Sequence, residues 1–348
     1  MPKKEWSNGA RIARMVIIDL VALAIALCTF SYFHHVRQPK VTPMEMPTPQ
    51  VTATPAPTAT PAPDVSVSVD PTAEPEPTVE PTPEPAGLLR GQYAEKFLAD
   101  GVEQSETVYR SQNVALELTE EWMYDSLVHI VDIYIQDISS FRTVLPYEEL
   151  GELKMNIADI KAQIPQALMM TSSDQFRNRS TSEWGFILRN GLLYDDNTSF
   201  CDICVLYQDG GMEVYAKGTA VPDEIYARGA HQIWSFGPIL VQNGAAMSEF
   251  PGGTGRSLGK NPRMGIGYFE PGHYCLVLAD GTRGSNTGSA GVSMAEFAEL
   301  FVSLGCTSAY NLDGGETATM MFGDRLLNDS SRRVTDGIYI TEPVEGGN

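Results

Sequence analysis

Positive charge is scarce in this chain, where 24 Lys and Arg stand against 44 Asp and Glu, for a formal net charge of −20 over 348 residues. Residues 1–38 carry +3 and residues 39–86 carry −6, so residues 87–348 carry −17. Because phosphate contacts need clustered cations, this balance argues against nucleic acid as a partner. An anionic polymer would also be repelled unless local arginines, or a divalent cation such as Ca²⁺ or Mg²⁺, offset the charge.

Cysteine is also sparse, with Cys28 near the N-terminus and four others farther along, Cys201, Cys204, Cys275 and Cys306. Those four allow two disulfides in three pairings. The CxxC spacing of Cys201 and Cys204 lacks the second pair that a zinc knuckle needs. Buried apolar thiols are the favoured interpretation, and the disulfide pairing stays open.

Long apolar runs are absent except at residues 15–33, which hold one charge, Asp19. This length suits a membrane-spanning helix, and the basic residues before it favour a cytoplasmic segment at 1–14. Phe30 and Phe33 prolong the run beyond a signal-peptide cleavage pattern. The sequence therefore predicts a single-pass plasma-membrane anchor with an extracellular C-terminal domain.

Proline is concentrated between the anchor and the rest of the chain, because residues 39–86 hold 14 of the 23 prolines. Such composition cannot bury a core and extends as polyproline II. A spacer is predicted here, followed by one globular domain over residues 88–344.

Alternating and turn patterns in that domain predict an α+β fold with a mixed β-sheet. A short amphipathic helix is expected over 88–103, strands over 113–118 and 127–135, and a hairpin over 203–215. His129 and His231 are interpreted as packed or hydrogen-bonded residues. The Gly-rich stretch 250–261 lacks P-loop spacing and is interpreted as a loop over a site.

The C-terminal third predicts a strand, a helix and a second strand. The first strand covers 274–279, Ser293 and Glu296 form a capping box, and Gly305 ends the helix. Two strands joined this way run parallel, so Asp280 and Asp313 are expected at the carboxyl ends of neighbouring strands, beside Arg283.

The segment 310–320 (YNLDGGETATM) ends the last of these strands with polar residues. Asn311 and Asp313 project to one side because they are two residues apart in a strand. Gly314 and Gly315 permit a positive φ and leave backbone N–H groups uncovered. A polar pocket rim is expected here, although Asp-Gly also suits an ordinary hairpin turn.

Six motifs occur in order along the second half of the chain: GFILRNG (185–191), SFGPILVQNG (235–244), NPRMGIGY (261–268), LADGTRG (278–284), LG (304–305) and NLDGG (311–315). Together they resemble the phosphodiester glycosidase family of N-acetylglucosamine-1-phosphodiester α-N-acetylglucosaminidase and its bacterial relatives. The resemblance is strongest over residues 168–341.

This resemblance implies hydrolysis of a sugar-1-phosphodiester, with a set of motif residues at the site. Carboxylates implied near the chemistry are Asp313, Asp280, Asp174 and Glu316; implied substrate contacts are Arg263, Arg283, Asn311, Gly314, Gly315 and Arg189. Asp280 and Arg189 are equally compatible with structural roles in their turns. Ser172-Ser173 and Glu316 depart from the family pattern, which has Asn-Gly and a third glycine there.

Three functions follow from these observations. The first is an extracytoplasmic hydrolase of sugar-1-phosphodiester linkages in cell-surface glycans or exopolysaccharide. The second is a surface polysaccharide-binding domain with altered catalysis, and the third is a glycosyl or phosphoglycosyl transferase of polymer assembly. Fold alone does not choose among them.

Overall fold

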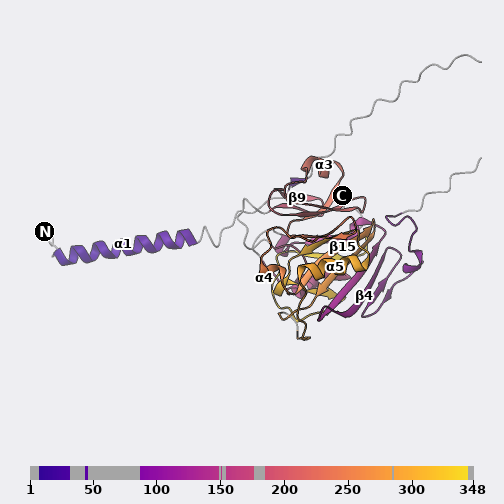
Figure 1. Ribbon diagram of the computed structural model, residues 1–348. Coiled ribbons are helices and arrows are strands. Elements are labelled where there is room, and N and C mark those ends of the chain that lie inside the picture. The colour runs from indigo at the N-terminus through magenta and orange to yellow at the C-terminus, as the bar shows by residue number, and fades with distance from the viewer. Residues whose placement is uncertain are drawn as a thin grey trace, which may run out of the picture.

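The computed structural model describes residues 8–31, 44–45, 87–148, 150, 154–175, 185–283 and 286–343. Within these residues the chain forms a sheet-rich domain with few helices (Figure 1). Every strand pairing recorded among them is antiparallel. The spacer predicted at 39–86 lies outside the described residues, apart from Met44–Glu45.

The largest sheet has nine strands and carries the C-terminal third of the chain. Its order is β14 (Ala245–Ala246), β13 (Ile239–Gln242), β17 (Ser308–Leu312), β15 (Arg263–Glu270), β16 (His273–Ala279), β5 (Ser126–Ile135), β4 (Val114–Met123), β3 (Val108–Arg110) and β2 (Glu103–Gln104). The strands predicted at 113–118 and 127–135 are confirmed as β4 and β5.

Two smaller sheets complete the domain. The six-stranded sheet has the order β1 (Met44–Glu45), β9 (Leu192–Asp196), β8 (Phe186–Arg189), β12 (Ala230–Trp234), β10 (Ile203–Tyr207) and β11 (Met212–Tyr215). The five-stranded sheet has the order β19 (Arg325–Leu326), β18 (Met320–Phe322), β7 (Met169–Ser172), β20 (Gly337–Ile340) and β6 (Phe141–Val144). The β10–β11 pair is the predicted hairpin.

Apolar residues from all three sheets meet in one central core, which includes Leu276, Trp234 and Ile338. The other face of the nine-stranded sheet is covered by α5 (Met294–Leu304), seen across β15 in Figure 1. The other α-helices of the sheet-rich domain are short: α2 (Ile157–Gln163), α3 (Pro222–Ala227) and α4 (Gly255–Leu258).

The predicted capping box is present at the start of α5, since Ser293 Oγ accepts from Glu296 N and the Glu296 side chain accepts from Ser293 N. Gly305 ends the helix with φ 92°. The neighbouring-strand prediction is wrong, however. β15 lies between β16 and β17 and is antiparallel to both, so those two strands run in the same direction but do not pair.

The helix predicted over 88–103 is also wrong, because only a 3₁₀ turn forms there, at Ala94–Lys96. Arg90 and Tyr93 adopt positive φ values of 48° and 57°, which interrupt a right-handed helix. Tyr93 and Phe97 instead pack against Tyr134 of β5. The spacing of apolar residues therefore predicted which side chains are buried but not the backbone conformation.

The cysteines are free thiols in the structure. Cys204, Cys275 and Cys306 are buried, as the apolar interpretation predicts, and the Sγ atoms of Cys275 and Cys306 lie 3.7 Å apart. Cys201 precedes β10 and is half-buried.

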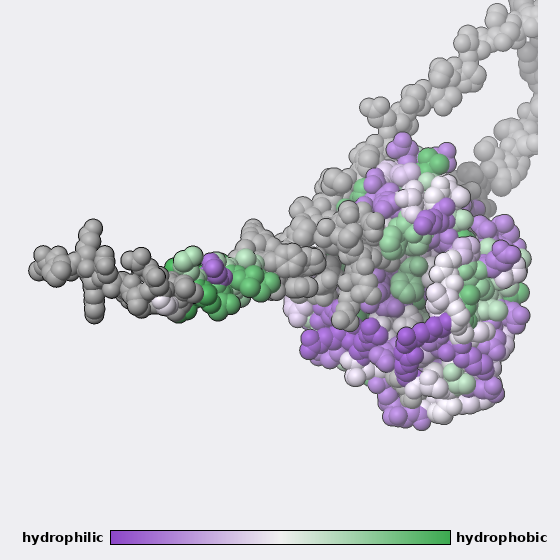
Figure 2. All heavy atoms as spheres, turned by 60° about the vertical axis from the view of Figure 1, so that its left-hand side comes forward, coloured by the Kyte–Doolittle hydropathy of each residue, from purple (hydrophilic) through white to green (hydrophobic). Residues whose placement is uncertain are grey.

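The apolar run near the N-terminus lies in α1 (Asn8–Ser31), whose described residues are mainly hydrophobic in Figure 2. No helix in the described part of the chain is both long and apolar enough to cross a membrane. The anchor at 15–33 is therefore not confirmed and stays a prediction.

Candidate functional site

A cavity of about 760 Å³ opens beside the ends of β15 and β17. This volume lies within the range of roughly 300–1,000 Å³ typical of small-molecule sites. Its lining comes from the six-stranded sheet, the β12–β13 connection, the loop 250–261 and the edge of the nine-stranded sheet. The lining residues include Phe200, Cys201, Asp202, Lys217, Phe236, Gly237, Pro238, Phe250, Arg256, Arg263, Arg283, Asn311, Asp313, Gly314 and Gly315.

Strand register places three predicted site residues at one edge of the nine-stranded sheet. Arg263 begins β15 and pairs with Ala279, the last residue of β16, while Met264 pairs with Leu312, the last residue of β17. Asp280 and Asp313 follow those last residues. Both aspartates thus lie at the carboxyl ends of their strands, as predicted. The antiparallel strand β15, which begins with Arg263, separates Asp280 from Asp313.

Arg263 is 5 % exposed and is held by backbone carbonyls. Its Nε donates to Val292 O at 3.1 Å, and one Nη donates to Ser257 O and Gly259 O at 2.7 Å each. Burial lowers the pKa of Arg263 to about 10. Within the described residues no carboxylate pairs with this guanidinium, so an anionic ligand would supply its missing counter-charge.

Asn311 and Asp313 both line the cavity, as their two-residue spacing predicts. The Asn311 side-chain nitrogen donates to Gly237 O at 2.7 Å. The prediction of uncovered backbone donors at the glycines is only partly correct, because Gly315 N donates to Pro262 O at 2.8 Å. Gly315 has φ 64°, and a Cβ on Gly314 would lie 2.9 Å from Pro262 O, so both positions require glycine.

Asp313 is a buried carboxyl, 7 % exposed, whose Oδ2 has no hydrogen-bond partner in the described structure. Burial raises the pKa of Asp313 to about 7. A hydrogen bond from the Thr317 side chain and the charge of Arg332 oppose that rise. A carboxyl tuned in this way exchanges a proton near neutral pH, which is what general acid or base chemistry needs.

The rim above Asp313 carries Glu316 between two arginines. Its carboxylate lies 4.0 Å from Arg283 and 3.6 Å from Arg332. Arg283 lines the cavity, whereas Glu316 is not among the lining residues. Glu316 therefore neutralises the rim cations and does not fill the cavity.

Asp280, predicted at the site, does not line the cavity and is fully buried. Its Oδ2 accepts from Thr287 Oγ1 at 3.3 Å and lies 3.6 Å from His129 Nε2. His129 Nδ1 in turn contacts Glu120 at 3.0 Å. Asp280 thus fits a structural role at the sheet edge, and His129 is the packed, partnered histidine that was expected.

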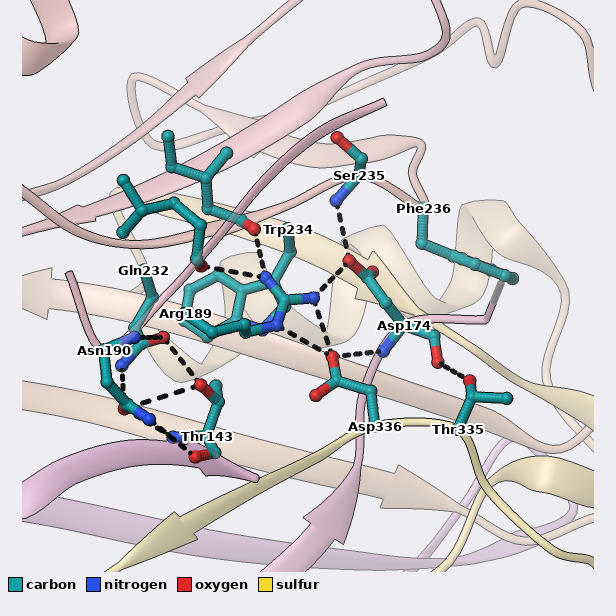
Figure 3. A network of polar contacts seen from close by, with 12 residues as sticks. Thr143, Asp174, Arg189, Asn190, Gln232, Trp234, Ser235, Phe236, Thr335 and Asp336 are labelled. Carbon is teal, nitrogen blue, oxygen red and sulfur yellow. Dashed lines mark hydrogen bonds and ion pairs between the residues drawn. The ribbon is translucent and has the colours of Figure 1, made fainter. Parts of the chain in front are cut away.

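Arg189 forms buried ion pairs with Asp174 and with a third residue, Asp336 (Figure 3). One Arg189 Nη lies 2.7 Å from both Asp174 Oδ2 and Asp336 Oδ2. Ser235 N also donates to Asp174 Oδ2 at 3.0 Å. Neither Asp174 nor Arg189 lines the cavity, so these two predicted site residues belong to its support.

Asp336 was missed by the sequence analysis. Its Asp-Gly dipeptide resembles an ordinary turn, and its partner Arg189 lies 147 residues away in the chain. Burial raises the pKa of Asp336, while the charge of Arg189 opposes that rise.

His231 is buried, with Nε2 2.8 Å from Phe141 O. Burial lowers the pKa of His231 to about 4. It is neutral at physiological pH and plays the hydrogen-bonded role expected of it.

The sequence left the cofactor open, with a divalent cation as one option. No group of three or more His, Cys, Asp or Glu in the described ranges is arranged to hold a metal ion.

Three phenylalanines, Phe200, Phe236 and Phe250, line the cavity beside the polar groups. Aromatic faces together with a few convergent polar groups are typical of sites for small organic ligands. Arginine and asparagine side chains add donors for phosphate or hydroxyl oxygens. The cavity thus combines apolar surface, cations and one carboxyl that titrates near neutrality.

The profile of the phosphodiester glycosidase family matches residues 166–341, which is half of the chain. The chain belongs to the phosphodiester glycosidase family. This match agrees with the resemblance over 168–341, and it includes every residue predicted for the site.

Individual relatives are distant. The SPbeta prophage-derived uncharacterized protein YomE of Bacillus subtilis is 28 % identical over 174 residues, covering 47 % of this chain and 27 % of that protein. The zebrafish N-acetylglucosamine-1-phosphodiester alpha-N-acetylglucosaminidase catalytic domain, auto-inhibited by its pro-peptide, has a TM-score of 0.50 at 17 % identity. That match covers 70 % of this chain and 86 % of the zebrafish one and shows a shared fold.

Proposed function

We propose that this protein hydrolyses a glycosyl phosphodiester, releasing a sugar and a phosphomonoester. The observation that carries the proposal is the pairing of two groups in one cavity. Arg263 is a buried cation without a carboxylate partner in the described structure, and Asp313 is a buried carboxyl with a pKa of about 7. Family membership supports the same reaction class.

The arginines suit the phosphate of such a substrate. Guanidinium groups bind phosphate oxygens through charge-assisted hydrogen bonds, and Arg263 is already oriented by three backbone carbonyls. Because the leaving phosphomonoester gains a charge when the bond to the anomeric carbon breaks, Arg263 and Arg283 would stabilise the transition state more than the ground state.

Asp313 suits attack on the anomeric carbon. A phosphomonoester is a weakly basic leaving group and needs little help from a general acid, so the more demanding step is activation of the attacking group. We assign Asp313, in its ionised form, as the base for a water molecule or as the nucleophile itself. Asn311 would orient a sugar hydroxyl or a phosphate oxygen, since its Oδ1 has no partner in the described structure.

The test is release of sugar from a panel of sugar-1-phosphodiesters by the full-length chain. Asp313→Asn is expected to lower kcat/KM by on the order of 100- to 10,000-fold. Asp324→Asn is the matched control, because this carboxylate is 99 % exposed and forms an ion pair with Lys161 on the surface. Equal activity of wild type and Asp313→Asn, or no turnover of any diester, would refute the proposal.

A second candidate is a glycan-binding domain with altered catalysis. The contact of Glu316 with Arg283 favours it, because a carboxylate on the rim competes with phosphate for that arginine. Under this alternative Glu316→Gly restores or raises turnover, and wild type binds polysaccharide without cleaving it. Under the first proposal, wild type turns over and Glu316→Gly changes mainly KM.

The location and the natural substrate are also proposed here. An apolar N-terminal run followed by a Pro-rich spacer supports an extracytoplasmic domain acting on cell-surface glycans. Protease added outside intact cells that express the chain should then digest the domain; protection of the domain would refute this location.

A further inference from the structure

Resting on the proposed function, we infer that the natural substrate carries a second anionic group, such as a second phosphate, which binds at Lys217 in the lining of the cavity. The substrate class would then be a glycosyl phosphodiester with two or more phosphates, such as a fragment of a repeating sugar-phosphate chain.

The first observation is the charge of the cavity lining. Four cations line it, Lys217, Arg256, Arg263 and Arg283, against only two carboxyls, Asp202 and Asp313. The whole chain has a net charge of −20, so the lining is reversed in sign relative to the molecule. A cationic cavity in an acidic protein focuses anions onto its own lining, while the remaining surface repels them.

The second observation is what the lining cations contact. Among the described residues, Lys217, Arg256 and Arg263 have no ion pair with a carboxylate. Asp202, the other acid of the lining besides Asp313, is occupied by backbone donors, with Lys217 N at 2.9 Å and Ile239 N at 3.2 Å. Asp313 is protonated in part near neutral pH. One phosphate between Arg263 and Arg283 would leave Lys217 and Arg256 unmatched.

The third observation is that these cations come from separate parts of the fold. Lys217 follows β11 of the six-stranded sheet, whereas Arg263 begins β15 of the nine-stranded sheet. Between them the lining runs through Asp202, Gly237 and Asn311. Phe200 and Phe236 line the same cavity as Lys217, so the cavity also offers apolar surface for a sugar.

The experiment compares two probes, glucose 1-phosphate and glucose 1,6-bisphosphate, by calorimetric titration of the full-length chain. The wild type is expected to bind the bisphosphate about tenfold more tightly, and Lys217→Gln to lose most of that ratio while keeping its affinity for the monophosphate. Lys96→Gln is the matched control. Lys96 pairs with Glu117 and lies over the ring of Tyr134, which pairs with the first residue of β16, whereas Arg263 pairs with its last residue.

The inference is overturned if wild type binds the two probes equally or binds neither. It is also overturned if the preference for the bisphosphate is unchanged in Lys217→Gln. These outcomes are independent of turnover. If diesters are cleaved but the two probes bind with equal affinity, the inference of a second anion site is wrong and the hydrolase proposal stands. If the ratio holds and no diester is cleaved, the hydrolase proposal fails and the chain is a binder of multiply phosphorylated sugars.

Discussion

At the scale of single residues, Asp313 links the proposed chemistry to pH. Its raised pKa of about 7 means that the ionised form required of a base or nucleophile grows as the pH rises through neutrality. We therefore expect kcat/KM to rise about tenfold per pH unit below pH 7 and to level off above it. A profile that falls through pH 7 would instead assign Asp313 as a general acid.

The same carboxyl should destabilise the folded protein at high pH. Because the pKa of Asp313 is raised from 3.8 to about 7, the folded state holds its proton more tightly than the unfolded state. Stability from this group is complete below about pH 4 and is lost as the pH rises to about 7. The loss is on the order of 4 kcal/mol, at about 1.4 kcal/mol per pKa unit.

Urea unfolding of wild type and Asp313→Asn between pH 4 and 8 measures this effect. The variant should be the more stable protein at pH 8, with a difference that shrinks toward pH 4. Asp324→Asn, on an exposed carboxylate, should show no such trend. A difference that is constant with pH would mean that Asp313 ionises normally in the folded state.

The sequence located several residues of this site because their signals are local. Asn311, Asp313 and the two glycines follow one another at the end of an apolar strand, where polar side chains and a backbone break stand out. Asp336 gave no such signal, because its role depends on Arg189, 147 residues away. Asp280 and Asp313 look alike in sequence. In the structure Asp280 contacts His129 and Thr287, whereas Asp313 lines the cavity.

At the scale of elements, β15 needs a residue without a side chain where α5 packs against it. A Cβ on Gly265 would lie 2.9 Å from ring atoms of both Phe297 and Phe301. Gly265→Ala should therefore lower the free energy of unfolding by about 1–3 kcal/mol, the usual cost of overpacking a core. Thermal or urea unfolding measures the change.

Gly255→Ala is the control for that prediction, since nothing lies within 4 Å of a Cβ at Gly255 and its φ is not positive. It should be neutral or slightly stabilising, because alanine favours helix in α4. If both variants had the same stability, the close packing of α5 on β15 would be wrong.

The order of strands was beyond local sequence patterns. The helix α5 was predicted from its capping box and terminal glycine, and the two strands that flank it from their apolar runs. Whether β17 joins β16 directly or on the far side of β15 depends on packing, not on those signals. Gly265 and Gly267 in β15 were the available clue, because they leave room for Phe301 beneath the helix.

At the scale of the whole molecule, the Arg189 ion pairs join two sheets. Arg189 ends β8 of the six-stranded sheet, while Asp174 and Asp336 adjoin β7 and β20 of the five-stranded sheet. The nine-stranded sheet is attached at the same place, since Asp313 N donates to Ser173 O at 2.8 Å. Residues of three sheets therefore meet beside this buried cation, and the proposed catalytic residue is hydrogen-bonded through its backbone to the residue before Asp174.

Arg189→Met removes that cation and leaves two buried carboxyls without a counter-charge. Burial lowers the pKa of Arg189, but the charges of Asp336 and Asp174 outweigh it and keep the side chain ionised. We expect the variant to lose about 3–5 kcal/mol of unfolding free energy at pH 8. The loss should shrink at pH 5, because burial raises the pKa of Asp336, so this carboxyl takes up a proton in the folded state and then needs no counter-charge.

Arg110→Met is the control, because the guanidinium of Arg110 is partly exposed and lies 3.6 Å from the half-exposed Glu103 on β2. Its effect should stay within about 1 kcal/mol at either pH. Equal destabilisation of Arg189→Met at pH 5 and pH 8 would mean that the arginine acts through packing and hydrogen bonds to Leu188 and Ile233. A loss that grows with pH, and falls when Asp336→Asn is added, would establish that charge balance holds the three sheets around the cavity.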